Sequence, residues 1–357
     1  MQLFWSKKQQ NDQASLVAAM QGTTEFALDL YRNLRATEGN LFFSPYSISA
    51  ALAMTYAGAR ADTQTQMAHA LHFLPDQKQL HPAFALLAAR LEEAGKKGHV
   101  QLSAANTLWP RTGYTFLKEF LNLAKKFYGV QITPVDYDDE EAARNTINKW
   151  VEEKTEGKIK DLIASGVLDS ATRLVLVNAI YFKGEWGSQF DPRLTSQAPF
   201  MVASGEPVQV PMMTCKHAFK YTEDSDLQIL ELRYAGDDLT MLETEVDVYL
   251  PRFELSFPFR LDDTLKSMGM VYAFSDQADF SGMDGSQELY LGAVLHKAFV
   301  AVEEQGTEAA AATAAIMTLK AISFSPVAFR ADHPFVFLIR EKSTGCILFI
   351  GRVVNPL

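Results

Sequence analysis

Few side chains in this 357-residue sequence are spaced for chemistry. His69 and His72 lie three residues apart in "AHALHF" and could share one face of a helix, a spacing that suits a pair of metal ligands. No third ligand accompanies them, so we interpret them as ordinary surface or packed histidines. His296 lies within the apolar stretch "VLHKAFVAV", where a hydrogen-bonded core histidine is expected. We expect no metal site.

The cysteines and the densest acidic run also have structural interpretations. Cys215 and Cys346 are far apart and in no metal-like spacing. Two cysteines in so long a chain exclude a disulfide scaffold, and we expect both to be free, packed thiols. The acids of "DYDDEEAARN" (136–145) are expected to form a solvated helix N-terminus and not a carboxylate pair for acid–base catalysis.

Strong enzyme signatures are absent from the sequence. It contains no G-x-G-x-x-G, no G-x-x-x-x-G-K-[ST], no H-E-x-x-H and no G-x-S-x-G. We therefore expect no enzymatic activity and no cofactor, and a hydrolase stays only as a remote alternative.

Composition excludes further classes of function. A net charge of −10 argues against general nucleic-acid binding, which needs a basic face. No run of 18 apolar residues is present to span a membrane. The short apolar run before Lys7 is too short for a signal-peptide core, so we expect either a cytoplasmic protein or a mature form whose leader has been trimmed.

The first third of the chain has helical character. In "FFSPYSISAALAMTYAGA", Ser44 suits an N-cap, Pro45 suits the first helical position, and Gly58 suits the end of the helix. Apolar residues recur at helical spacing in "SLVAAMQGTTEFALDLYRNL". Further helices are predicted over 80–94, 115–127 and 140–153.

Strand patterns replace the helical ones from about residue 171. "TRLVLVNAIYFKGEW" is a nearly continuous apolar run, typical of a strand buried on both faces. The last segment, "HPFVFLIREKSTGCILFIGRVVNPL", predicts a hairpin that turns at residues 342–345. Further strands are predicted in "PVQVPMM", "LQILELRYA" and "EVDVYLPRFELSFPF". Helices first, strands later and no linker between them indicate a single α+β domain over 1–357.

The stretch "EEQGTEAAAATAAI" (303–316) is the unusual one. As a helix it would have neither an apolar stripe nor a polar face. As a strand its side chains alternate between two faces. One face carries Thr307, Ala309, Ala311 and Thr313, all small enough to enter a packed sheet, and the other carries Glu308, Ala310, Ala312 and Ala314, with Glu308 left at the solvent face.

Six segments, in order along the chain, together resemble the serpin family of protease inhibitors. These segments are "NLFFSPYSISAALAMTYAGARADT", "NKWVEEKTEGKIKDLI", "LVLVNAIYFKGEW", the strand around His296, "EEQGTEAAAATAAI" and the C-terminal hairpin. The resemblance implies a serpin fold with N-terminal helices, a large central mixed sheet A, further sheets B and C, and an exposed reactive-centre loop at about 304–326.

The resemblance also implies roles for particular residues. Asn40, Ser44, Pro45 and Ser47 match the family's helix B segment, Asn178 is expected beside Ser47 and His296 in the shutter of sheet A, and Trp186 in its breach. The loop hinge would comprise Glu304, Gly306, Thr307, Glu308, Ala309, Ala310, Ala311 and Ala312.

A serpin would act as a suicide substrate. A serine protease would attack the loop and form a covalent acyl complex, after which the cleaved loop would insert into sheet A. The resemblance implies a scissile residue about seventeen positions into the loop, counted from the hinge glutamate. With Glu304 as the first position the seventeenth is Lys320, so the expected scissile bond is Lys320–Ala321 and the expected target is trypsin-like. Leu319 would instead suit a chymotrypsin-like protease, and Met317 or Ile322 an elastase-like one.

Two further expectations follow from the resemblance. The protein would be a monomer that can polymerise by inserting a loop into the sheet of another copy. A non-inhibitory serpin acting as a binding or chaperone module is the alternative class, but such hinges often carry bulky, charged or proline residues. Residues 306–316 carry only Glu308 of that kind, on the outward face.

One junction departs from the family pattern. Met241 is followed directly by Leu242, and on the order of 35 residues are absent by comparison, including most of a central strand of sheet B; a strand removed from a core leaves a cavity or a new edge. Either the sequence lacks a segment or neighbouring structure closes the gap, and we favour the first.

Overall fold

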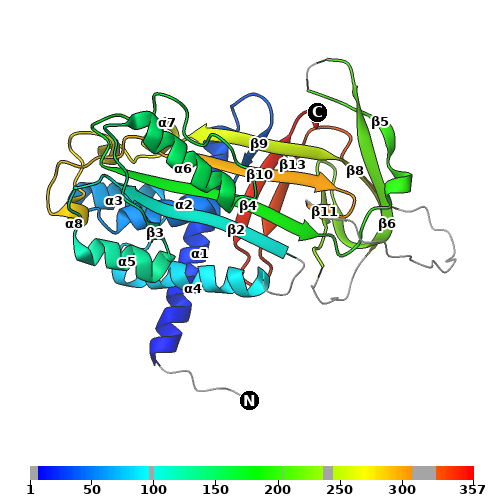
Figure 1. Ribbon diagram of the computed structural model, residues 1–357. Coiled ribbons are helices and arrows are strands. Elements are labelled where there is room, and N and C mark those ends of the chain that lie inside the picture. Colours follow the sequence, from blue (N-terminus) through cyan, green and yellow to red (C-terminus); the bar gives the residue numbers. More distant parts are fainter. Residues whose placement is uncertain (1–6, 96–99, 204, 236–243, 308–326) are drawn as a thin grey trace.

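The computed structural model describes residues 7–95, 100–203, 205–235, 244–307 and 327–357 of the chain. Helices dominate its first half, as predicted (Figure 1). Ser44 caps α2 by accepting a hydrogen bond from the Ser47 amide, and Pro45 is the first helical residue. The helices of this half are α1 (Lys7–Leu34), α2 (Pro45–Tyr56), α3 (Ala61–Ala70), α4 (Gln77–Gly95), α5 (Lys118–Tyr128) and α6 (Glu140–Lys154).

A six-stranded mixed sheet forms the centre of the molecule. Its strands, in spatial order, are β3 (Gln131–Ile132), β2 (Val100–Pro110), β4 (Leu174–Glu185), β11 (Gly306–Thr307), β10 (Leu295–Glu303) and β9 (Phe253–Arg260). β2 was not predicted. Its sequence "VQLSAANTLWP" mixes small and polar residues without clear alternation, yet it pairs with β4 from Val100 opposite Gly184 to Pro110 opposite Leu174.

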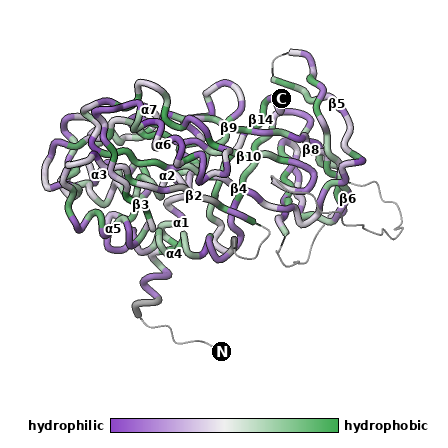
Figure 2. The backbone as a smooth tube through the Cα atoms, viewed as in Figure 1, coloured by the Kyte–Doolittle hydropathy of each residue, from purple (hydrophilic) through white to green (hydrophobic). Residues whose placement is uncertain are grey.

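Both faces of this sheet are covered. On one face α6 and the segment after it pack against Val177, Ala179 and Tyr181 of β4. On the other face Ile180 and Phe182 join a core with the C-terminal strands. β4 is thus buried on both sides, as its continuous apolar run predicts. Figure 2 shows hydrophobic stretches along these central strands and a hydrophilic start to α1, which projects from the body.

Two smaller sheets complete the fold. The first has the order β1 (Leu41–Phe43), β14 (Ile347–Val353), β13 (Phe335–Arg340), and it contains the predicted C-terminal hairpin. The second has the order β12 (Val327–Arg330), β8 (Thr244–Pro251), β6 (Val208–Glu223), β5 (Ser196–Phe200), with β7 (Gln228–Glu231) also paired to β6. The short elements are η1 (Pro192–Leu194), η2 (Tyr272–Phe274), α7 (Asp262–Ser267) and α8 (Ser281–Asp284).

β7 and β13 each have one edge without a strand partner among the described residues. β7 pairs with β6 and β13 pairs with β14, and an ion pair of 3.1 Å between Arg340 Nη2 and Glu231 Oε2 links the two. Val336 and Leu338 on β13 are half exposed. The junction Met241–Leu242, at which a strand was expected to be missing, lies outside the described residues.

Candidate functional site: the seam between β4 and β10

The parallel strands β4 and β10 meet along a line that we call the seam. At one end they pair directly, with Lys297 opposite Ala179 and Phe299 opposite Tyr181. At the other end the two residues of β11 lie between them, and Thr307 pairs with Gly184 of β4 and with Val302 of β10. The chain thus turns back after β10 and begins a new strand inside the sheet (Figure 1).

The two inserted residues are closely fitted. Gly306 has no room for a side chain, because a Cβ atom there would lie 2.1 Å from the Gly184 carbonyl oxygen and 2.7 Å from Glu185 Cα. The side chain of Thr307 is fully buried, and its hydroxyl lies 2.8 Å from the hydroxyl of Tyr234. A small polar residue is therefore accommodated here with its hydroxyl satisfied.

Glu304 anchors the turn that leads into β11. Its side chain is 6% exposed, pairs with Arg252, and accepts a hydrogen bond of 2.7 Å from the Thr195 hydroxyl. Burial raises the pKa of this carboxyl, but the bonds from Arg252 and Thr195 outweigh burial and hold its pKa below the ordinary value. Glu304 is therefore a charged anchor.

Trp186 lies at the same end of the seam as β11. Its indole Nε1 donates to the Glu303 carbonyl at 2.9 Å, and its amide donates to the Gln305 carbonyl at 2.9 Å. The ring stacks on Tyr234 with 4.8 Å between centroids and 12° between planes. Trp186 therefore holds the backbone on both sides of Glu304, at the position the resemblance assigns to the breach.

A buried polar network lies at the closed end of the seam, the end at which β4 and β10 pair directly. The Ser44 amide donates to His296 Nε2 at 3.0 Å, and the Ser47 hydroxyl donates to Asn178 Oδ1 at 2.7 Å. Because Nε2 accepts a hydrogen bond, the ring proton lies on Nδ1, which faces Asn178 Oδ1 at 3.3 Å. Burial lowers the pKa of His296 to about 3, so the imidazole is neutral.

This network gathers the predicted residues and one that sequence reasoning missed. Asn178 Nδ2 donates at 2.7 Å to Asn106 Oδ1 on β2. Asn106 had no local signal, because a single amide in an unrecognised strand has no pattern. Asn40 lies apart from the network, and binds the C-terminal end through the amides of Val354 and Asn355.

Most of the predicted loop falls outside the described residues. This applies to Glu308, Ala309, Ala310, Ala311 and Ala312 of the hinge and to the predicted scissile pair Lys320–Ala321. The described part of the hinge is Glu304–Thr307.

The other chemically suggestive residues have structural roles. His72 lies between two carboxylates of α1, with Nε2 2.8 Å from Asp29 and Nδ1 3.2 Å from Glu25. Cys215 and Cys346 are free, as predicted. The described residues contain no group of three or more potential metal ligands.

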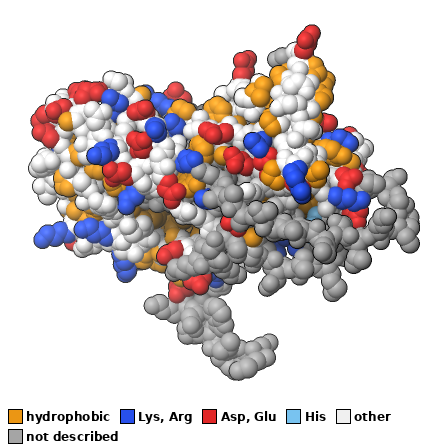
Figure 3. All heavy atoms as spheres, turned by 45° about the vertical axis from the view of Figure 1, so that its right-hand side comes forward, with side chains coloured by type: hydrophobic (Ala, Val, Ile, Leu, Met, Phe, Trp, Pro, Cys, Tyr) orange, Lys and Arg blue, Asp and Glu red, His pale blue; other side chains and the backbone are white. Residues whose placement is uncertain are grey.

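The predicted acids of 136–145 start a helix. Asp139 caps α6 by accepting from the Ala142 amide, and Glu140 and Glu141 occupy the first turn. Charges of both signs are interspersed on the face shown in Figure 3. Within the described residues no helix is both long enough and apolar enough to cross a membrane.

Two residues at the start of a loop thus lie as an additional strand between two central strands of the sheet. The chain belongs to the serpin family: the family model described as "Serpin (serine protease inhibitor)" matches residues 21–244 and 239–356. Serpins of this inhibitory type are protease inhibitors and not catalysts.

Particular relatives agree with this assignment. The leukocyte elastase inhibitor of Sus scrofa is 42% identical over 374 aligned positions, which cover 93% of this chain and 98% of the relative. The human leukocyte elastase inhibitor is 40% identical with the same coverage. Among solved structures, Serpin48 of Tenebrio molitor has a TM-score of 0.84 at 31% identity and covers 94% of this chain and 98% of that one. Uncleaved ovalbumin has a TM-score of 0.82 at 28% identity, covering 95% and 100%.

The matches also bear on the unusual junction. The family model matches in two pieces that overlap at residues 239–244. The 374 positions aligned with the porcine relative exceed the 357 residues of this chain, so that relative carries residues without a counterpart here.

Proposed function

We propose that this serpin inhibits serine proteases irreversibly, as a suicide substrate whose cleaved loop inserts along the seam. The observation that carries the proposal is β11: Gly306 and Thr307 already lie between β4 and β10 as the first two residues of an additional strand. A strand that has begun to enter can lengthen by one residue at a time if its free end is released.

The chemistry is supplied by the protease. The hydroxyl oxygen of its serine attacks the carbonyl carbon of the scissile residue, and the protease histidine takes the proton of that hydroxyl. The peptide C–N bond then breaks, and the histidine passes the proton to the leaving amine. The inhibitor is left as an acyl ester on that serine, and its loop is no longer tethered at the far end. Residues after Thr307 then extend β11 and carry the protease with them.

Insertion is energetically favourable. A dozen new ladder hydrogen bonds, at roughly 0.5–1.5 kcal/mol each, are worth on the order of 10 kcal/mol. That is comparable with the stability of a whole domain. The uncleaved protein is therefore held by a barrier, and its persistence is kinetic.

We place the scissile bond at Lys320–Ala321. Lys320 is the seventeenth residue from Glu304, and lysine suits a specificity pocket with a buried aspartate. The proposed target is a trypsin-like serine protease.

An elastase-like target is the second candidate. It is favoured by the relatives, because the porcine and human proteins are both named leukocyte elastase inhibitors. Met317 and Ile322 would serve such an enzyme, and Leu319 a chymotrypsin-like one.

The test is to mix the protein separately with trypsin, chymotrypsin and elastase. We expect a complex with trypsin that survives boiling in SDS, and a released fragment whose mass corresponds to residues 321–357. A complex with elastase instead, with cleavage beside Met317 or Ile322, would select the second candidate. Complete cleavage by every protease with no stable complex would refute suicide inhibition and favour a binding or chaperone role.

A further inference from the structure

The strands β7 and β13 come near each other without pairing. An ion pair of 3.1 Å joins Glu231, the last residue of β7, to Arg340, the last residue of β13. Neighbouring strands of one sheet lie about 4.8 Å apart and exchange main-chain hydrogen bonds. Within the described residues, however, β7 pairs only with β6 and β13 only with β14. Long side chains thus meet where the backbones do not, as expected where one strand is absent. We call the two unpaired strand edges the open edges.

The side chains along the open edges form two apolar rows. Val336 and Leu338 of β13 are half exposed, whereas Phe337 between them packs against the hydrophobic core. On β7, Ile229 is half exposed and Leu230 packs against the same core. Because side chains alternate along a strand, a strand lying between the open edges would place one row beside the core residues and the other beside the exposed ones. Both rows would be in apolar surroundings.

Charge marks one end of the open edges. Glu231 follows Ile229 by two positions and Arg340 follows Leu338 by two, so the ion pair belongs to the exposed row. Lys220 Nζ also lies 3.6 Å from Glu231 Oε1. The side chains of Lys220 and Arg340 are both partly exposed, and these two cations share one carboxylate. A second carboxylate at this end would therefore complement the charge.

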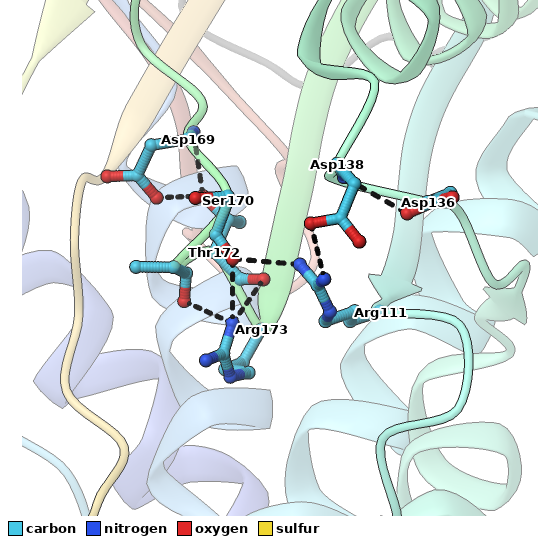
Figure 4. Close-up of polar contacts among 8 residues, drawn as sticks. Arg111, Asp136, Asp138, Asp169, Ser170, Thr172 and Arg173 are labelled. Atoms are coloured by element: carbon cyan, nitrogen blue, oxygen red, sulfur yellow. Dashed lines mark hydrogen bonds and ion pairs between the residues drawn. The ribbon is translucent and has the colours of Figure 1, made fainter.

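The arginines at the end of β2 show the contrast. Arg111 donates to the Asp138 carboxylate at 2.7 Å and to the Ser170 carbonyl at 2.8 Å (Figure 4). Arg173 donates to the same Ser170 carbonyl at 3.0 Å. The protein supplies these acceptors itself, and the Arg111 side chain is only 19% exposed, against 54% for Arg340. Arg340 is thus the arginine that a partner can reach.

The break in the family match lies beside the open edges. The two matched pieces overlap at residues 239–244, after β7 and at the start of β8. The porcine relative carries residues that have no counterpart here. The open edges therefore coincide with the place at which relatives have polypeptide that this chain lacks.

We propose that the open edges bind one extended peptide segment of a different protein, with apolar side chains in both rows and a carboxylate at the end beside Arg340. Main-chain hydrogen bonds to β7 and β13 supply the affinity, and the two rows supply the selectivity. Both strands end at the ion pair, so a segment antiparallel to both begins there, and antiparallel pairing is the commoner kind. The proposal goes beyond protease inhibition and does not depend on it.

The test uses a labelled synthetic peptide with the residues of the porcine relative that lie opposite the break in the family match, and a glutamate added at its N-terminus. Binding to the full chain is followed by fluorescence anisotropy, and hydrogen exchange is measured at residues 228–231 and 335–340. We expect saturable binding that slows exchange on both strands. A proline at the centre of the peptide should abolish binding, because it removes a main-chain donor and disrupts the ladder.

Protein variants locate the site. Leu338→Lys should weaken binding about tenfold, because it replaces apolar contact by a charge that the peptide would cover. Val271→Lys alters a residue that is also half exposed but lies outside both strands, and it should bind like the parent. Val336→Lys replaces Leu338→Lys if the latter does not fold. Arg340→Gln, or omission of the added glutamate, should weaken binding about threefold.

Three results would overturn the proposal. One is the absence of peptide binding, and another is binding that neither Leu338→Lys nor the central proline weakens. The third is a parent protein that sediments as a dimer which Leu338→Lys dissociates, since a second copy would then occupy the open edges. Failure of protease inhibition is distinguishable, because the peptide assay contains no protease.

Discussion

The two ends of the seam are built from different kinds of contact. The end at β11 is held by a charged pair, Glu304 with Arg252, and by the stacked rings of Trp186 and Tyr234. The closed end is held by His296 and its neutral partners, all buried. Arg252 is 45% exposed, so water can compete for the charged pair, whereas the polar network at the other end is buried and must break as a whole. The difference indicates where the sheet yields first.

The same difference explains the residue types at each end. The parted end takes Gly306 and Thr307, which leave no large side chain to clear. The closed end needs polar groups that satisfy one another, since each unpaired buried group costs about 1–3 kcal/mol. One end of the seam thus accommodates a strand of small residues, and the other end is held together by a hydrogen-bonded polar network.

The largest expected effect comes from a charge placed where the strand enters. Thr307→Arg would require burying a guanidinium at a site with 0% exposure, beside Tyr234. Insertion should stall and the protein should become a substrate, with the stoichiometry of inhibition rising by about tenfold or more. Titration against the target protease measures this. Thr222→Arg, on an exposed position of β6, is the matched control and should leave the stoichiometry unchanged.

A steric change at the same end should have a smaller effect. Gly306→Val places a side chain against the Gly184 carbonyl and Glu185 Cα. The hinge should leave the seam, with a loss of about 1–3 kcal/mol in the free energy of unfolding. Hydrogen exchange at Gly184 and Glu185 should accelerate.

The control for this change is Gly292→Ala, where a Cβ meets nothing within 4 Å. If Gly306→Val left the hydrogen exchange of the β4 amides unchanged, the pairing of β11 would not be what protects this end of β4.

The closed end should respond to acid. Burial lowers the pKa of His296 from 6.5 to about 3 in the folded protein. Between these two pH values the imidazole is protonated in the unfolded chain and neutral in the folded one. The free energy of unfolding should therefore fall as the pH drops from 6.5 towards 3, by up to about 1.4 kcal/mol per pH unit, and be insensitive above 6.5. Thermal midpoints from pH 8 to pH 4 measure it.

A second buried histidine sharpens this measurement. Burial lowers the pKa of His81 to about 4, so it titrates in the same range. His296→Gln should remove only its own share of the pH dependence. If the slope between pH 6 and pH 4 were the same with and without His296, the closed end would not be the acid-sensitive part.

Much of the seam could be predicted from sequence, because its residues come in local patterns. The apolar run of β4 and the caps of α2 follow from short-range physical chemistry. The resemblance then placed Ser47, Asn178 and His296 together, and the hydrogen bonds join them.

The partners of the hinge could not be predicted in the same way. Thr195, Tyr234 and Arg252 reach it from separate elements, and a single polar residue on a strand carries no signal of its distant contact. Nor does the alternation of side chains reveal which two strands receive Gly306 and Thr307, since that depends on how β4 and β10 pair beside them.

The smallest expected effect tests the charged anchor. Glu304→Gln keeps an oxygen that can accept from Thr195 but loses the charge that Arg252 pairs with. Arg252 is 45% exposed, so water screens the pair and the loss should be about 1 kcal/mol or less. Because the pKa of Glu304 is held below its ordinary value, its stabilisation is present at neutral pH and is lost as the pH falls through the folded pKa. The melting difference between parent and variant should therefore shrink in acid and in high salt. A melting difference that stayed constant in acid and in high salt would show that Glu304 acts through hydrogen bonding alone. The contrast between the β11 end and the closed end of the seam would then rest on Trp186 and Tyr234.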